Sequence, residues 1–346
     1  MDDLPRRYAR LVAAWANGRA DAETLTAIAT EARGLAADAR PAWYRVQAAG
    51  LAAAADSALG RALDLEALVG APLPPIDAGV TARLDDLARG TGTLVGRLAT
   101  HRAATAVPAD VLQHVMSRMV ALLLQRAEDD LKLSLGIPSL VVELSAGGEG
   151  SAWYRIDRTG ETHRLVVNAD RRWTAGRVLQ ASGSAAMRHF ASLLRLPRPE
   201  WHPAPQTTVD IGMAVVGREI LLGDHELEYE LARIGRGAGI RWSGNQVVSV
   251  QRTIEELAPA LAALALSGGS DVRAFARLGV SPGEADALRA RWTDPFARAD
   301  RVARAAGPPL VRQWLVTTGQ TAGFGRLLRE WLVPTELRSG SGDDAT

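Results

Sequence analysis

The chain has 346 residues, of which 47% are apolar and 23% are charged, and its formal net charge is +1. These values are typical of a globular protein with a sizeable core, and they exclude an overall charge that would attract nucleic acid or anionic membranes. The sequence contains no cysteine, which excludes disulfides, thiolate metal sites and a cysteine nucleophile. Lys132 is the only lysine. In so alanine-rich a chain, this arginine bias indicates a GC-rich genome rather than phosphate binding.

The N-terminal segment lacks the pattern of a signal peptide, because Arg10, Asn17 and Arg19 interrupt its apolar run. The most apolar stretch, Leu257 to Leu266, is shorter than the ~18 apolar residues that a membrane-spanning helix needs. We therefore expect a cytoplasmic protein without a membrane partner.

The N-terminal region, residues 1–105, is predicted to be helical. Apolar side chains recur at helical spacing over residues 7–66, and alanine, the best helix former, fills most other positions. Asp21 is a typical first residue for a helix. The proline-rich segment 71–75 predicts a break, and a further helical stretch is expected over residues 78–105.

The pattern changes after a long predicted helix over residues 109–135. Three short runs of β-branched, apolar and aromatic residues then follow, and they predict a small three-stranded β-sheet near residues 139–168. Helices resume near Thr174, with a proline-rich interruption over 197–205. We therefore expect a mainly α protein. Its second region, residues 106–338, should form one compact unit with the first, and residues 339–346 should be a frayed polar tail.

Several short motifs occur in a fixed order from residue 108 onward. The long helix ends in a Gly-Ile-Pro turn, aromatic residues begin the β segment, and a Val-Val-Asn-Ala-Asp stretch ends it. Two later motifs fall near the C-terminus. The five segments are Gly136-Ile137-Pro138, Trp153-Tyr154, Leu165 to Asp170, Trp314 to Gly319 and Phe324 to Leu332. This order resembles a family of HExxH-type, gluzincin-like zinc peptidases, and the resemblance implies a helical gluzincin-like scaffold.

The zinc-binding positions of that family hold other residues in this chain. The resemblance aligns the first histidine with Gln180, the glutamate base with Ala181, and the distal histidine with Ala186 or Met187. It aligns the ligand glutamate with Ile211. A catalytic zinc needs about three N or O protein ligands, and a glutamate must take a proton from the bound water. No HExxH occurs anywhere in the sequence, and His225-Glu226 has no second histidine four residues on.

The resemblance therefore implies a catalytically inactive pseudo-peptidase with no metal and no cofactor. It would bind a small apolar or peptide-like ligand, or a protein partner, in the former active-site cleft. The residues expected to line that cleft are Gln180, Ser182, Ser184, Ala185, Met187, Ile211 and Met213. Collapse of this cleft into the core is an equally open expectation.

Two alternatives remain open at this point. The first is an enzyme that uses metal-free chemistry, for which Ser182, Ser184, His189 and Glu219 are the candidate catalytic groups. The second is DNA binding by residues 273–291, which have the pattern of a helix-turn-helix. Binding of nucleic acid is disfavoured there, because acidic residues occupy the start of the second helix and would repel phosphate.

Overall fold

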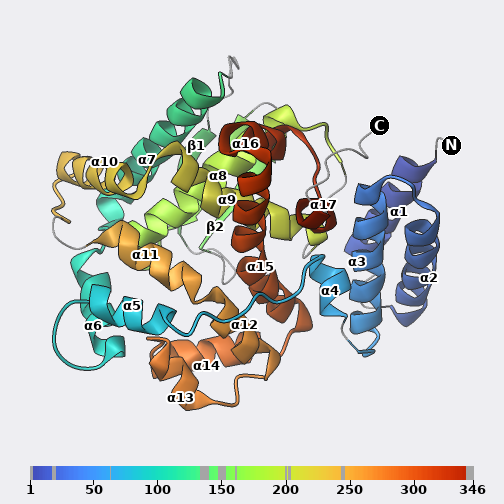
Figure 1. Ribbon diagram of the computed structural model, residues 1–346, viewed down its shortest axis with the longest axis horizontal. Coiled ribbons are helices and arrows are strands. Elements are labelled where there is room, and N and C mark those ends of the chain that lie inside the picture. Colours follow the sequence, from blue (N-terminus) through green and yellow to red (C-terminus); the bar gives the residue numbers. More distant parts are fainter. Residues whose placement is uncertain are drawn as a thin grey trace.

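Helices form most of the chain and surround one small sheet (Figure 1). The computed structural model describes residues 3–17, 21–62, 64–132, 140–146, 153–159, 162–198, 201, 204–242 and 246–339. The mainly α class and the small three-stranded sheet expected from the sequence are both confirmed. Within the described residues, none of the helices is both long and apolar enough to cross a membrane.

The first four helices gather at one end of the molecule (Figure 1). They are α1 (Leu4–Asn17), α2 (Ala22–Asp38), α3 (Ala42–Ala58) and α4 (Leu65–Val69). Asp21 caps α2 as expected, because its carboxylate accepts hydrogen bonds from the backbone N–H of Glu23 at 3.1 Å and of Thr24 at 3.0 Å. Their apolar faces share one core with Ala299 and Val302 of α15, so the N-terminal helices pack against the C-terminal part of the chain.

The helical stretch expected over residues 78–105 is present but interrupted. The structure has two helices there, α5 (Val80–Leu87) and α6 (Leu94–Ala104). Gly90 and Gly92 lie between them with φ angles of +121° and +96°, which side-chain-bearing residues rarely adopt. Helix α6 then begins at a Thr93 cap, whose hydroxyl accepts from the N–H of Gly96 at 3.2 Å.

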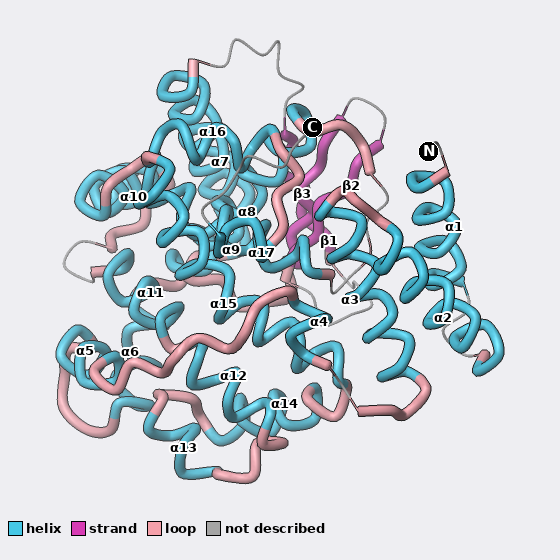
Figure 2. The backbone as a smooth tube through the Cα atoms, turned by 45° about the vertical axis from the view of Figure 1, so that its right-hand side comes forward, coloured by secondary structure: helices cyan, strands magenta, loops and turns pink. Residues whose placement is uncertain are grey.

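The sheet follows the long helix α7 (Ala109–Leu131) and consists of β1 (Leu140–Ser145), β2 (Tyr154–Thr159) and β3 (Thr162–Asn168). Strand β3 is central. It pairs with β1 in parallel and with β2 antiparallel, so that Leu165 lies opposite both Val142 and Ile156. Figure 2 shows the three strands side by side. The Gly136-Ile137-Pro138 turn lies outside the described residues.

Three long helices form the centre of the second region: α8 (Ala175–Leu194), α9 (Pro205–Leu221) and α15 (Pro295–Thr318). Helices α9 and α15 cross where two glycines meet. A Cβ atom on Gly212 would lie 2.4 Å from the carbonyl oxygen of Gly307, and one on Gly307 would lie 2.3 Å from the carbonyl oxygen of Thr208. No side chain fits between the two backbones, so both positions require glycine.

Smaller helices complete the second region around this centre. They are α10 (Asp224–Gly237), α11 (Val247–Glu256), α12 (Ala258–Leu266), α13 (Val272–Arg277), α14 (Pro282–Arg291), α16 (Gln320–Arg329) and α17 (Pro334–Ser339). Helix α17 contains residue 339, and residues 340–346 of the expected tail lie outside the described residues.

The crossing of α9 and α15 predicts a strong effect for one added methyl group. We expect Gly212→Ala to lower the free energy of unfolding by about 3 kcal/mol, because neither backbone can move away without unpacking the core. Gly34→Ala is the matched control. A Cβ atom on Gly34, which lies in α2, would have nothing within 4 Å, so the control should gain about 0.5–1 kcal/mol. Urea denaturation measures both, and equal effects of the two variants would contradict the role given to the crossing.

Candidate functional site

Two of the positions that the resemblance assigned to a former active site come together in the structure. Gln180 of α8 and Ile211 of α9 line the same pocket, which has a volume of about 180 Å³. The other aligned positions do not reach it. Ala181, Ala186 and Met187 are buried in the core. Because four arginines surround this pocket, we call it the arginine pocket; they are Arg102, Arg177, Arg301 and Arg304.

Helices α6, α8, α9, α11, α12 and α15 supply the residues of the arginine pocket. One part of its wall is apolar and includes Ile211, Val215, Val250, Ile254 and Leu261. The polar part adds two amides and a carboxylate, from Gln180, Gln251 and Glu255. The pocket therefore combines an apolar wall with concentrated positive charge.

Three of the four arginines have partners within the chain. Arg102 pairs with Glu284 at 2.9 Å, and Arg304 pairs with Asp300 at 2.8 Å. Arg177 donates to the Gln180 amide oxygen at 3.1 Å, and its guanidinium lies 5.0 Å from the centre of the Trp153 ring. Within the described part of the chain, half-buried Arg301 has neither an ion pair nor a hydrogen bond.

The electrostatic surroundings of Arg301 reflect this lack of a counter-charge. Burial, followed by the positive charge of Arg304, lowers the pKa of Arg301 from the ordinary arginine value to about 10, although Asp300 opposes the shift. Burial, with the charges of Arg102 and Arg304, also lowers the pKa of Arg177. Arg301 remains cationic at neutral pH, because pH 7 lies well below its pKa of about 10. A bound anion would relieve the mutual repulsion of these arginines.

His101 also lines the arginine pocket. Burial, and then the neighbouring charge of Arg102, lower its pKa below 6.5. Its imidazole is therefore neutral at pH 7 and offers one donor and one acceptor rather than a further positive charge.

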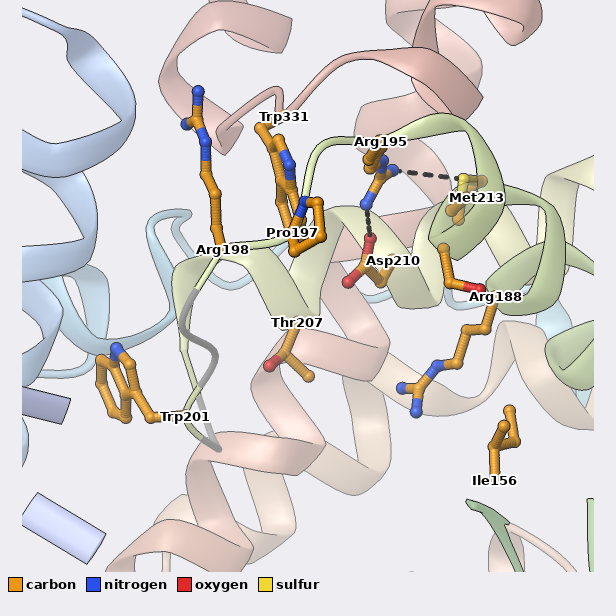
Figure 3. A pocket seen from close by; sticks show the side chains of 12 residues that line it. Ile156, Arg188, Arg195, Pro197, Arg198, Trp201, Thr207, Asp210, Met213 and Trp331 are labelled. Carbon is orange, nitrogen blue, oxygen red and sulfur yellow. Dashed lines mark hydrogen bonds and ion pairs between the residues drawn. The ribbon is translucent and has the colours of Figure 1, made fainter. Parts of the chain in front are cut away.

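A second pocket, of about 610 Å³, lies at the other end of α8 and includes Met213, another residue of the expected cleft (Figure 3). Two of its arginines have partners within the protein. Arg195 pairs with Asp210 at 2.9 Å, and the guanidinium of Arg198 lies 4.6 Å from the centre of the Trp43 ring. Arg188 lies apart from them, near Ile156 (Figure 3). This pocket is larger and also combines three arginines with apolar side chains. The arginine pocket differs in that its arginines lie close enough for their charges to lower the pKa of Arg301 and of Arg177.

The remaining residues of the expected cleft do not line either pocket. Ser182 is buried, and its hydroxyl donates to the sulfur of Met116 at 3.0 Å. Ala185 and Met187 are part of the core, and Ser184 is half-buried on α8. The expected cleft is therefore only partly open: its ends at Gln180, Ile211 and Met213 reach pockets, and its middle is filled.

The groups named for metal-free catalysis each contact a different partner. Glu219 forms a two-point ion pair with Arg312, at 2.7 and 3.1 Å. His189 is fully buried, and its Nδ1 lies 2.7 Å from Nδ1 of His163. The structure therefore does not bring Ser182, Ser184, His189 and Glu219 together in one site.

The contact between His163 and His189 could not be predicted from the sequence. The two residues lie on β3 and α8, and no local pattern relates them. Ser192 is near, with its hydroxyl 3.4 Å from Nδ1 of His163 and donating to the carbonyl oxygen of His189 at 2.7 Å. Both His189 and Ser192 approach the same nitrogen of His163. A proton relay needs the two nitrogens of a ring for different partners, so His189 and Ser192 cannot be the two ends of a relay through His163.

The segment with a helix-turn-helix pattern does form two helices, α13 and α14. Ser281 and Glu284 cap α14 reciprocally, as expected for the start of that helix. Glu284 also pairs with Arg102, so this acidic residue helps to hold one wall of the arginine pocket.

Among the described residues, no group of three or more histidine, aspartate and glutamate side chains could hold a metal ion. His225 is exposed at the start of α10, and Glu226 beside it pairs with Arg126. His202 lies outside the described residues. The chain matches no protein-family model, no curated protein and no solved structure.

The low pKa of Arg301 predicts that removal of this half-buried charge does not destabilise the protein. Because its pKa in the folded protein, about 10, is below that of a free arginine, folding disfavours its charged form at every pH below 10. This penalty fades as the pH rises from 10 toward the ordinary pKa of arginine. We expect Arg301→Gln to leave the melting temperature at pH 7 unchanged or slightly higher, as measured by calorimetry.

The control for this experiment is Arg304→Gln, which breaks the ion pair with buried Asp300 and should lower the melting temperature. If Arg301→Gln destabilised the protein as much as Arg304→Gln, Arg301 would have a structural role instead.

Proposed function

We propose that this protein is a ligand-binding protein without zinc-dependent hydrolase activity, and that the arginine pocket holds a small molecule with a carboxylate or phosphate group. The observation that carries this proposal is Arg301, a half-buried cation without a partner in the described chain, placed beside Arg177 and Arg304. Uncompensated charge of this kind is costly inside a protein, and it is typical of functional sites.

The chemistry of the pocket supports an anionic ligand with an uncharged body. Guanidinium groups donate two parallel hydrogen bonds to a carboxylate or phosphate. The amides of Gln180 and Gln251 add neutral donors and acceptors. The apolar wall around Ile211 and Val215 would contact the remainder of the ligand.

The resemblance to zinc peptidases is part of the same proposal. Gln180 and Ile211, which align with two ligand positions of that family, both line the arginine pocket. A former metal site converted into a binding site for an anion would be consistent with this placement. The pseudo-peptidase origin and the cytoplasmic location thus remain parts of the proposal.

The two other functions considered from the sequence have less support. Metal-free catalysis would need Ser182, His189 and Glu219 in one site, and their contacts separate them. DNA binding would need a basic start to α14, where Glu284 lies instead.

Isothermal titration calorimetry with inorganic phosphate and with butyrate tests the proposal directly. We expect Arg301→Gln to weaken the binding of the better probe by about tenfold or more, because a charge-assisted hydrogen bond is lost. Affinity should also fall as the pH rises through about 10, where Arg301 loses its proton.

The matched control is Arg236→Gln, which removes the same charge from an exposed position on α10 outside the pocket. Binding that is equally weakened in both variants would reflect overall charge and would sink the proposal. Absence of binding by either probe at low salt would do the same.

Metal content provides an independent test of the second half of the proposal. We expect elemental mass spectrometry of the purified protein, after dialysis against a weak chelator, to find no stoichiometric zinc. One zinc ion per chain would overturn the claim that the protein is not a zinc hydrolase. It would direct attention to His189, His202, His225 and nearby carboxylates.

A further inference from the structure

The arginine pocket adjoins a neighbouring hollow of about 340 Å³. Val215, Glu255, Arg304 and Pro308 line both cavities, so the two are adjacent, and we call the pair the groove. Five prolines line the neighbouring hollow, and we call this surface the proline shelf; they are Pro74, Pro75, Pro259, Pro308 and Pro309.

The charges along the proline shelf are balanced within the protein. Arg83 pairs with Asp77 and Glu256, both at 2.8 Å. Arg252 pairs with Asp224 at 2.7 Å, and Arg312 pairs with Glu219 at 2.7 Å.

The carboxylate at the junction of the two cavities is balanced as well. Glu255 pairs with buried Arg218 and accepts from the amide of Gln251 at 2.9 Å. Among the described residues, the cations of the groove without a carboxylate partner are therefore Arg301 and Arg177, and both line the arginine pocket rather than the proline shelf. A ligand that matches this distribution carries its negative charge at one end only.

Much of the surface between the two ends of the groove is apolar, and the two charged residues at the junction, Glu255 and Arg304, are paired with Arg218 and Asp300. Val215 and Pro308 lie at the junction, and Ile254 and Leu261 lie on the arginine side. Proline rings have no N–H group to offer to a ligand. A ligand that extends from Arg301 along this surface gains chiefly by burying apolar area.

The sizes of the cavities favour such an extended ligand. The arginine pocket alone, at about 180 Å³, is smaller than the ~300–1,000 Å³ of typical small-molecule sites. It accommodates a head group and a few more atoms. The neighbouring hollow supplies the additional volume.

We propose that the ligand is an amphipathic monoanion with an alkyl tail, such as a medium-chain carboxylate, whose head group lies at Arg301 and whose tail lies on the proline shelf. This inference rests on the proposed anion-binding function and adds the class of the ligand to it. The carboxylate compensates the charge of Arg301, and the tail covers the apolar surface between the two cavities.

Titration calorimetry with butyrate, hexanoate, octanoate and decanoate, all below their micellar concentrations, tests the inference. Affinity should rise by up to about fourfold for each added methylene that is buried against the groove. Arg301→Gln should weaken every member of the series by a similar factor, because all share the head group. Octanol, which lacks the charge, should bind more weakly than octanoate.

A pair of proline variants locates the tail. Pro75→Asp places a negative charge on the shelf and should abolish the gain from hexanoate to decanoate while leaving butyrate unchanged. Pro72→Asp is the control, because Pro72 is exposed in the same segment but does not line the groove. This variant should retain the full dependence on chain length.

The outcomes separate this inference from the function on which it rests. If butyrate and decanoate bound equally well, with both depending on Arg301, the tail would be refuted and the anion site would stand. Insensitivity of the chain-length gain to Pro75→Asp, or tighter binding of an N-acetylated peptide without charged side chains than of octanoate, would also refute the alkyl tail. Failure of phosphate and all carboxylates to bind in an Arg301-dependent manner would refute both proposals.

Discussion

The contact between the backbones of α9 and α15 determines where the candidate site lies. At Gly212 and Gly307 the helices approach so closely that neither can carry a side chain. This approach brings Ile211 and Val215 of α9 to the same cavity as Arg301 and Arg304 of α15. Helix α15 also contributes to both large hydrophobic cores. The orientation of the arginines therefore depends on two residues that have no side chain.

The two pockets show different ways of treating buried arginine. In the larger pocket, half-buried Arg188 has no ion pair or hydrogen bond among the described residues, but it lies apart from the other two arginines (Figure 3). Arg195 of that pocket has Asp210 beside it, and the rings of Trp43 and Trp331 lie against Arg198. In the arginine pocket, Arg301 has no such compensation within the described chain, and its charge disfavours the folded state. Proteins commonly give up stability at sites that bind or react. A site that holds uncompensated positive charge before an anion binds lowers the stability of the free protein. The same charge raises the affinity of the site for the anion.

Local signals made the fold class predictable, whereas the site depended on contacts between distant parts of the chain. The cap at Asp21 and the alternating residues of the strands act over a few positions, and the structure confirms both. The helical stretch expected over 78–105 is interrupted because Gly90 and Gly92 adopt positive φ angles, which helical periodicity does not reveal. Arg301 could not be singled out among so many arginines, since its lack of a partner appears only when α15 packs on α9.

The double proline of α15 has a consequence for how the chain acquires its structure. Pro308 and Pro309 cannot donate to the carbonyl groups one turn earlier, so α15 lacks two backbone hydrogen bonds in its middle. The helix therefore depends on its neighbours to hold its two halves together at this point. A ribosome makes α9 well before this segment emerges, and until then the face of α9 that packs on α15 has no partner there. Synthesis of this protein thus includes an interval in which an apolar face of α9 is uncovered, and exposed surface of this kind favours aggregation.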